Sequence, residues 1–157
     1  EGGIYFTDPR YRTREVMELD NESLYYLSND GELQRVDSDY TRPNGLIGTP
    51  DGKILYVADY GAEFINKYTI ESAGVLSNKT HFVDSRSDGM TLDEHGNLYL
   101  TKEVVAIYRS DGSFLGEIKL PNGSTNVTFG GKDRKTLYIT DGNLLMKIDM
   151  QVAGVAR

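Results

Sequence analysis

The stretch RPNGLIGTPDGKILYVADY, residues 42–60, decides the fold of this chain. It has the pattern of one β-hairpin: residues 46–49 form a short strand, Pro50-Asp51-Gly52 supplies the turn, and residues 54–58 form a β-branched and aromatic strand. An amide, Asn44, opens the first strand, and a carboxylate, Asp59, closes the second. Because a hairpin returns to its starting edge, we expect both side chains at the same end of a sheet.

The same hairpin recurs along the chain. Residues 88–102 and 126–141 repeat the two-strand pattern, and residues 3–8 match the second strand of a further copy. The aligned tyrosines are 51, 43 and 39 residues apart: Tyr5, Tyr56, Tyr99 and Tyr138. Four-stranded propeller blades repeat at about 40–50 residues, so this period predicts an all-β fold, a β-propeller.

The hairpins divide residues 1–157 into blades near 1–37, 44–84, 88–119 and 126–157. These make a partial β-propeller domain of about three and a half four-stranded blades. In the second blade the pattern predicts a third strand at 64–70, a loop at 71–74 and an outer strand near 81–83. The apolar residues alternate mostly with a period of two, so no helix is expected.

Three polar residues align at the head of the inner strand: Asn44, Asp88 and Asn126. Asp-Gly pairs are usually turns, but the hairpin of Asp88 already has its turn at His95-Gly96. The inner strands of a propeller line its central channel, so these residues are expected at the channel mouth. Their oxygens are hard donors, suited to Ca²⁺ or another divalent cation rather than to a soft metal. A second set of residues, Asp8, Asp59 and Asp141, recurs at strand ends, which favours a structural role in each blade, such as accepting backbone hydrogen bonds.

Four motifs resemble the SMP-30/gluconolactonase/luciferin-regenerating-enzyme (LRE-like) family: IYFTDP at 4–9, RPNGL at 42–46, SDGM at 87–90 and TNVTFGG at 125–131. The resemblance covers essentially the whole chain, and the motifs follow the order of the family. It implies a six-bladed propeller with one divalent cation in the central tunnel, and lactone hydrolysis. Ca²⁺ is the cation expected first, with Zn²⁺, Mg²⁺ and Mn²⁺ as alternatives.

The resemblance also implies roles for single residues. Asn44 and Asp88 match metal ligands, and Asp88 stands in the place of the catalytic acid/base. The family's other two ligands, a glutamate and an asparagine, would precede residue 1. Asn126 is expected to be a structural residue behind the ligands rather than a ligand.

The long polar loop after Asp8 leaves its strand on the mouth face. Its residues Arg10, Tyr11 and Arg14 are candidates for binding a lactone or sugar-acid substrate, because guanidinium groups bind such oxygens well. A solvated loop without a ligand is the equal alternative.

The length of the chain limits the number of propeller blades that it can form. Six blades at about 40–50 residues need roughly 240–300 residues, so we expect this chain to be the C-terminal half of a propeller. The missing half would come from the same parent chain or from a second copy.

Composition excludes several partners. The formal charge is −7, from 17 basic and 24 acidic residues, which disfavours nucleic-acid binding. No apolar run approaches the roughly 18 residues of a membrane span, and there is no cysteine. The sequence does not distinguish between a cytoplasmic and a periplasmic or secreted protein.

The sequence therefore predicts a metal-dependent, gluconolactonase-like hydrolase of lactones, in which an Asp activates water beside the cation. The alternative is a non-enzymatic propeller that acts as a binding scaffold, or an inactive fragment of the enzyme.

Overall fold

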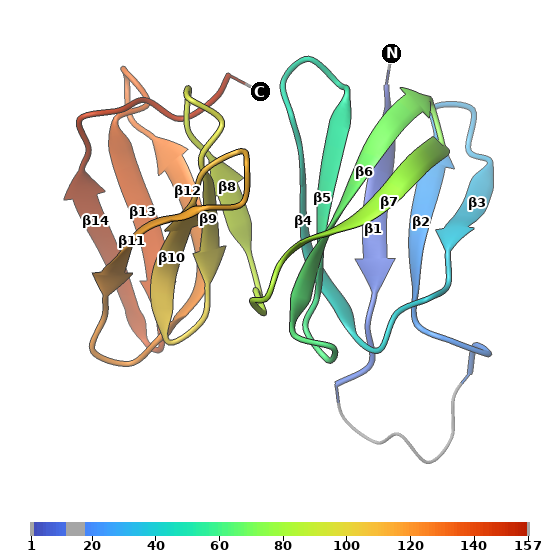
Figure 1. Ribbon diagram of the computed structural model, residues 1–157, viewed down its shortest axis with the longest axis horizontal. Helices are drawn as coiled ribbons and strands as arrows, with labels where there is room; N and C mark the ends of the chain where they lie inside the picture. Colours follow the sequence, from blue (N-terminus) through green and yellow to red (C-terminus); the bar gives the residue numbers. More distant parts are fainter. Residues whose placement is uncertain (1, 12–17, 157) are drawn as a thin grey trace. The chain divides into compact units, whose positions relative to one another are not determined.

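Figure 1 shows a computed structural model that describes residues 2–11 and 18–156. Within these residues, fourteen strands form four antiparallel sheets, and none of the described segments is a helix with the length and apolar character needed to cross a membrane. The chain divides into two compact units, Glu1–Asp84 and Ser85–Arg157, with two sheets in each. At four strands a blade, fourteen strands make three and a half blades, so the fold is all-β and of the β-propeller class.

The first unit holds a three-stranded and a four-stranded sheet among its described residues. The three-stranded sheet consists of β1 (Gly3–Asp8), β2 (Ser23–Ser28) and β3 (Leu33–Asp37). The four-stranded sheet consists of β4 (Pro43–Gly48), β5 (Ile54–Asp59), β6 (Phe64–Ser72) and β7 (Val75–Val83). In both sheets, strands that follow one another in sequence are neighbours, as hairpin connections require.

The second unit also holds one four-stranded and one three-stranded sheet among its described residues, but here the four-stranded sheet comes first in the sequence. Its four-stranded sheet consists of β8 (Met90–Leu92), β9 (Leu98–Thr101), β10 (Val104–Tyr108) and β11 (Phe114–Lys119). Its three-stranded sheet consists of β12 (Ser124–Gly130), β13 (Thr136–Asp141) and β14 (Leu144–Asp149).

Each unit has a core between its two sheets. In the first unit the fully buried members are Leu24, Leu55, Val57 and Tyr68, and in the second they are Tyr99, Val105, Val127, Leu137 and Ile139. The second strands of the two four-stranded sheets, β5 and β9, are buried along almost their whole length, as strands covered on both faces must be. Full burial of one such side chain stabilises the fold by about 1.5–3 kcal/mol, so the repeated β-branched and aromatic hairpins form the stable framework.

The outer strand of the second sheet differs from the sequence prediction. The predicted outer strand near 81–83 lies within β7 but was too short, and the predicted loop at 71–74 was too long, because β6 continues to Ser72 and β7 begins at Val75. Gly74, with φ 73°, makes the tight turn between them, and its amide donates to the Tyr5 hydroxyl at 3.0 Å. The pairing of β6 and β7 is irregular, and Asn78 has φ 50°. These irregularities break the alternation of apolar and polar residues, so the sequence pattern does not show the full length of the strand.

The inner strands β4 and β12 carry an irregularity near their heads. Pro43 pairs with Asp59 and Leu46 with Val57, so residues 44–45 together face one residue of β5. In β12 the pairing shifts between Ser124 and Asn126, so Asn126 is the third residue of its strand and not its head. Such bulges redirect side chains and are common beside active sites.

Candidate functional site

The backbone that leads into Asn44 is held by a buried carboxylate. Asp59, at the end of β5, is 2% exposed and accepts hydrogen bonds from three backbone amides: Thr41 at 2.9 Å, Arg42 at 3.0 Å and Ala62 at 3.1 Å. Asp59 therefore has the structural role expected of the recurring strand-end aspartates. It fixes the turn from which the half-buried Asn44 projects.

A hydrogen bond from the neighbouring sheet also reaches this position. The Thr7 hydroxyl of β1 donates to the Asn44 carbonyl at 2.7 Å. The end of β1 and the start of β4 therefore lie together at the lower end of the first unit in Figure 1. The loop that leaves β1 begins at the same end with Pro9, two residues beyond Thr7.

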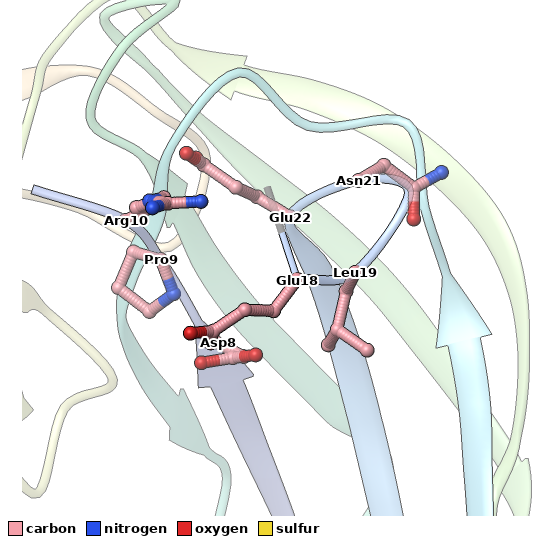
Figure 2. A pocket seen from close by; sticks show the side chains of 7 residues that line it. All are labelled: Asp8, Pro9, Arg10, Glu18, Leu19, Asn21 and Glu22. Carbon is pink, nitrogen blue, oxygen red and sulfur yellow. The ribbon is translucent and has the colours of Figure 1, made fainter. Parts of the chain in front are cut away.

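A pocket of about 210 Å³ lies where this loop leaves the strand. Figure 2 shows its lining residues: Asp8, Pro9, Arg10, Glu18, Leu19, Asn21 and Glu22. Three carboxylates and one guanidinium surround the space, and the side chains of Asp8 and Glu18 project toward the same part of it. Asp8 is exposed here, unlike Asp59, so the strand-end aspartates do not all have the same role. The pocket suits a polar ligand rich in hydroxyl groups.

Two of the three predicted substrate-binding residues can be placed. Arg10 lines the pocket, and Tyr11 is 53% exposed beside it in the sequence. The guanidinium carbon of Arg42 lies 5.8 Å from the centroid of the Tyr11 ring, a cation–π contact. Arg14 lies outside the described residues.

Arg42 is a candidate that sequence reasoning missed. Its Nε is buried without a hydrogen-bond partner within the described part of the chain, an uncommon state for a guanidinium donor. Arg42 lies two residues before Asn44, and its backbone amide donates a hydrogen bond to Asp59. The only sequence signal was its place in the RPNGL motif.

The second unit carries Asp88, half-buried two residues before β8. The Asp88 amide donates to the Thr101 carbonyl at 3.2 Å, and the next amide, that of Gly89, donates to the Thr101 hydroxyl at 2.8 Å. The backbone of Asp88 is thus tied to the end of β9. Asp88 thus lies two residues ahead of β8, the strand at whose head the sequence predicted it.

Asn126 lies against the backbone next to Asp88. A Cβ atom built on Gly89 would come within 2.3 Å of the Asn126 Oδ1, so any larger residue at position 89 would displace the amide. The same oxygen accepts a hydrogen bond from the Val127 amide at 2.9 Å. This contact suits a residue that supports the Asp88 turn.

The donor set fits a hard cation. An amide oxygen from Asn44 and a carboxylate from Asp88 are ligands that Ca²⁺ and Mg²⁺ accept. Asn44 belongs to the first unit and Asp88 to the second, so their sharing one ion stays a prediction. Within residues 2–11 and 18–156, no three His, Cys, Asp or Glu side chains form a group that could hold a metal.

Comparison with known proteins identifies the family. A sequence model described as the SMP-30/gluconolactonase/LRE-like region matches residues 1–143. The chain belongs to this family. Among its members, a gluconolactonase of Zymomonas mobilis is 31% identical over 174 residues, covering 98% of this chain and 49% of the relative. The pentonolactonase XacC of Haloferax volcanii is 32% identical over 127 residues, covering 74% of this chain and 44% of the relative.

A solved structure of the family supports the fold. The gluconolactonase XC5397 of Xanthomonas campestris is 31% identical to this chain and superposes with a TM-score of 0.84, over 98% of this chain and 54% of that one. The resemblance seen in the sequence motifs is therefore confirmed. The chain spans about half the length of these family members.

Proposed function

We propose that the whole protein is a metal-dependent lactone hydrolase of the gluconolactonase type, with Asp88 as the base that activates water. The observation that carries the proposal is the placement of Asp88: a half-buried carboxylate on a fixed backbone just ahead of β8, in a chain whose relatives include a gluconolactonase and a pentonolactonase.

In this proposal each residue has a role that its position allows. Asp88 accepts the proton of the attacking water, and Asn44 supplies an amide oxygen to the cation. A bound divalent cation, Ca²⁺ first and Zn²⁺, Mg²⁺ or Mn²⁺ as alternatives, would polarise the lactone carbonyl and stabilise the oxyanion. Asn126 supports the turn that carries Asp88, as its contact with Gly89 suggests.

The pocket beside Asp8 is the proposed binding place for the polyhydroxylated part of the lactone. Arg10 and Tyr11 would contact the substrate, with the Arg42 guanidinium against the Tyr11 ring, and Arg14 stays a candidate from the sequence. Guanidinium donors and carboxylate acceptors in one pocket can both bind sugar hydroxyls.

The test is lactone hydrolysis by the whole protein, followed as acid release with gluconolactone. We expect activity that chelator removes and Ca²⁺ restores. Asp88→Asn keeps the size of the side chain but cannot accept a proton, and loss of a general base costs about 10²–10⁴-fold in rate. Asp111→Asn, in an exposed turn, is the matched control and should keep the wild-type rate. Weak turnover that is insensitive to chelator and to Asp88→Asn would favour the non-enzymatic scaffold instead.

We also propose that further propeller blades cover the exposed apolar surfaces of this chain. The first sheet has an apolar groove of about 410 Å³ lined in part by Phe6, Leu19, Tyr25 and Leu33, and Leu145 on the last sheet is 73% exposed. Exposed apolar surfaces of this kind usually contact another part of a protein. Since the relatives are about twice as long, further blades of the same protein are the proposed cover. Light scattering on the 17.5 kDa chain alone should show self-association, and a soluble folded monomer would contradict this part.

A further inference from the structure

Two buried hydroxyl groups enclose the backbone around Asp88. Ser87 and Thr101 are both 0% exposed. The Ser87 hydroxyl donates to the Gly89 carbonyl at 2.7 Å and accepts from the Thr101 amide at 2.9 Å. The Thr101 hydroxyl donates to the same carbonyl at 2.8 Å and accepts from the Gly89 amide at 2.8 Å. We call this pair of residues the hydroxyl clamp.

The hydroxyl clamp leaves the Asp88 backbone little freedom. Both polar backbone groups of Gly89 and the amide of Asp88 have partners on Ser87 or Thr101. Moving this turn would leave two buried hydroxyls and a buried carbonyl without partners, at a cost of about 1–3 kcal/mol for each such group. The turn that carries Asp88 is therefore fixed from both sides.

The clamp is not a general feature of the hairpins. In the hairpin of Asn44, the positions that correspond to Ser87 and Thr101 hold Pro43 and Ala58, neither of which has a hydroxyl. Thr140 occupies the position of Thr101 in the last sheet, but it is not buried, and its hydroxyl bonds to the Thr125 hydroxyl at 2.8 Å. Buried hydroxyls ahead of β8 and at the end of β9 thus coincide with the hairpin that bears the carboxylate.

We propose that Ser87 and Thr101 are positioning residues that fix Asp88 for the hydrolysis proposed above, on which this inference rests. A base must lie within hydrogen-bond reach of the proton that it takes, and a displacement of about 1 Å can cost 10²-fold in rate. Hydroxyl groups can hold the turn without adding a charge next to Asp88. The same fixed backbone would orient the Asp88 carboxylate toward a cation.

The experiment compares three variants of the whole protein. Thr101→Val removes the hydroxyl and keeps the shape, Thr101→Ser keeps the hydroxyl, and Thr128→Val changes an exposed threonine of β12 as the control. Lactone kinetics give kcat and KM, calorimetric titration with CaCl₂ gives cation affinity, and thermal unfolding checks the fold. Ser87→Ala tests the clamp from its other side if Thr101→Val does not fold.

We expect Thr101→Val to lower kcat by about 10–100-fold with KM unchanged, and to weaken Ca²⁺ binding by about tenfold, as loss of a supporting hydrogen bond does at other metal sites. Thr101→Ser should stay within about threefold of wild type, because it retains the bonds to Gly89. A Thr101→Val variant with wild-type kcat and Ca²⁺ affinity would overturn the inference. So would a Thr101→Ser variant as impaired as Thr101→Val, since the methyl group would then be what matters.

The two readouts separate this inference from the proposed function. If the wild-type protein binds Ca²⁺ but hydrolyses no lactone, the proposed function fails, and a tenfold weaker Ca²⁺ affinity of Thr101→Val still supports the clamp. If the wild-type protein is active and Thr101→Val matches it, only the clamp fails. A wild-type protein with neither property overturns both.

Discussion

The hairpins of Asn44 and Asp88 occupy corresponding places in their sheets, but different chemistry holds each of them. At Asn44 a buried carboxylate, Asp59, binds three backbone amides of the adjoining turns. At Asp88 the corresponding strand-end residue is Lys102, and two buried hydroxyls, those of Ser87 and Thr101, bind the backbone instead.

The difference follows the charge of the residue being held. Asn44 is neutral, so a carboxylate beneath its turn does not affect its protonation. Asp88 is acidic, and a second carboxylate nearby would disfavour its ionised form. The hairpins of Asn44 and Asn126 therefore have an aspartate at the strand end. The hairpin of Asp88, the proposed base, has Lys102 at that position.

The largest expected effect comes from removing the carboxylate at the Asn44 hairpin. Asp59→Ala should lower the free energy of unfolding by about 2–4 kcal/mol, because it leaves three partly buried amides without their acceptor. Asp141→Ala is the matched control. Asp141 accepts one backbone amide, that of Asn122 at 3.0 Å, and its Oδ2 has no partner among the described residues. Urea denaturation should show a loss below about 1 kcal/mol for it; equal losses would remove the distinction between the two aspartates.

A second change gives the Asp88 hairpin the carboxylate that it lacks. Lys102→Asp replaces a positive charge by a negative one at the end of β9, near the ion pair of Arg86 and Glu103. The added negative charge should raise the pKa of Asp88, so that the base is protonated at a higher pH. The acidic limb of the kcat/KM profile should then move to higher pH.

Lys119→Asp, on the 85% exposed Lys119 side chain, makes the same charge change on β11. Its pH profile should match that of the wild type. If Lys102→Asp also leaves the acidic limb in place, charge is not the reason why the two hairpins differ.

The smallest expected effect concerns the loop beside the Asn44 hairpin. Tyr11→Ala removes the ring that contacts the Arg42 guanidinium, an interaction worth about 0.5–1 kcal/mol at an exposed site. We expect KM for a sugar lactone to rise by about three- to fivefold with kcat unchanged. Tyr11→Phe keeps the aromatic face and should behave as wild type; if it is as impaired as Tyr11→Ala, the hydroxyl rather than the ring is what the site uses.

The sequence contains most of the fold because its signals are local. The turn residues of each hairpin, the β-branched alternation and the spacing of the tyrosines are all visible in the sequence, and they are enough to place Asn44 and Asp88 close to the heads of inner strands. The long β7 was underestimated because its polar stretch and the irregular residue Asn78 break that alternation.

The surroundings of the site could not be predicted in the same way. The hydroxyl clamp depends on which residues of β9 face the residues before β8, and the contact of Arg42 with Tyr11 joins segments that a long loop separates. The first is set by cross-strand register and the second by the path of the loop, and alternation alone reveals neither. The position of Asn126 was also not predictable from alternation, since it is the third residue of β12 and lies next to a bulge.

We propose that Asn44 and Asp88 bind one cation. A crystal structure of the whole protein grown with Ca²⁺ tests this most directly. We expect one ion with the Asn44 Oδ1 and an Asp88 carboxylate oxygen both about 2.3–2.6 Å away. Asn44 and Asp88 side chains that point into separate blades, or a Ca²⁺ ion bound elsewhere with neither residue near it, would contradict it.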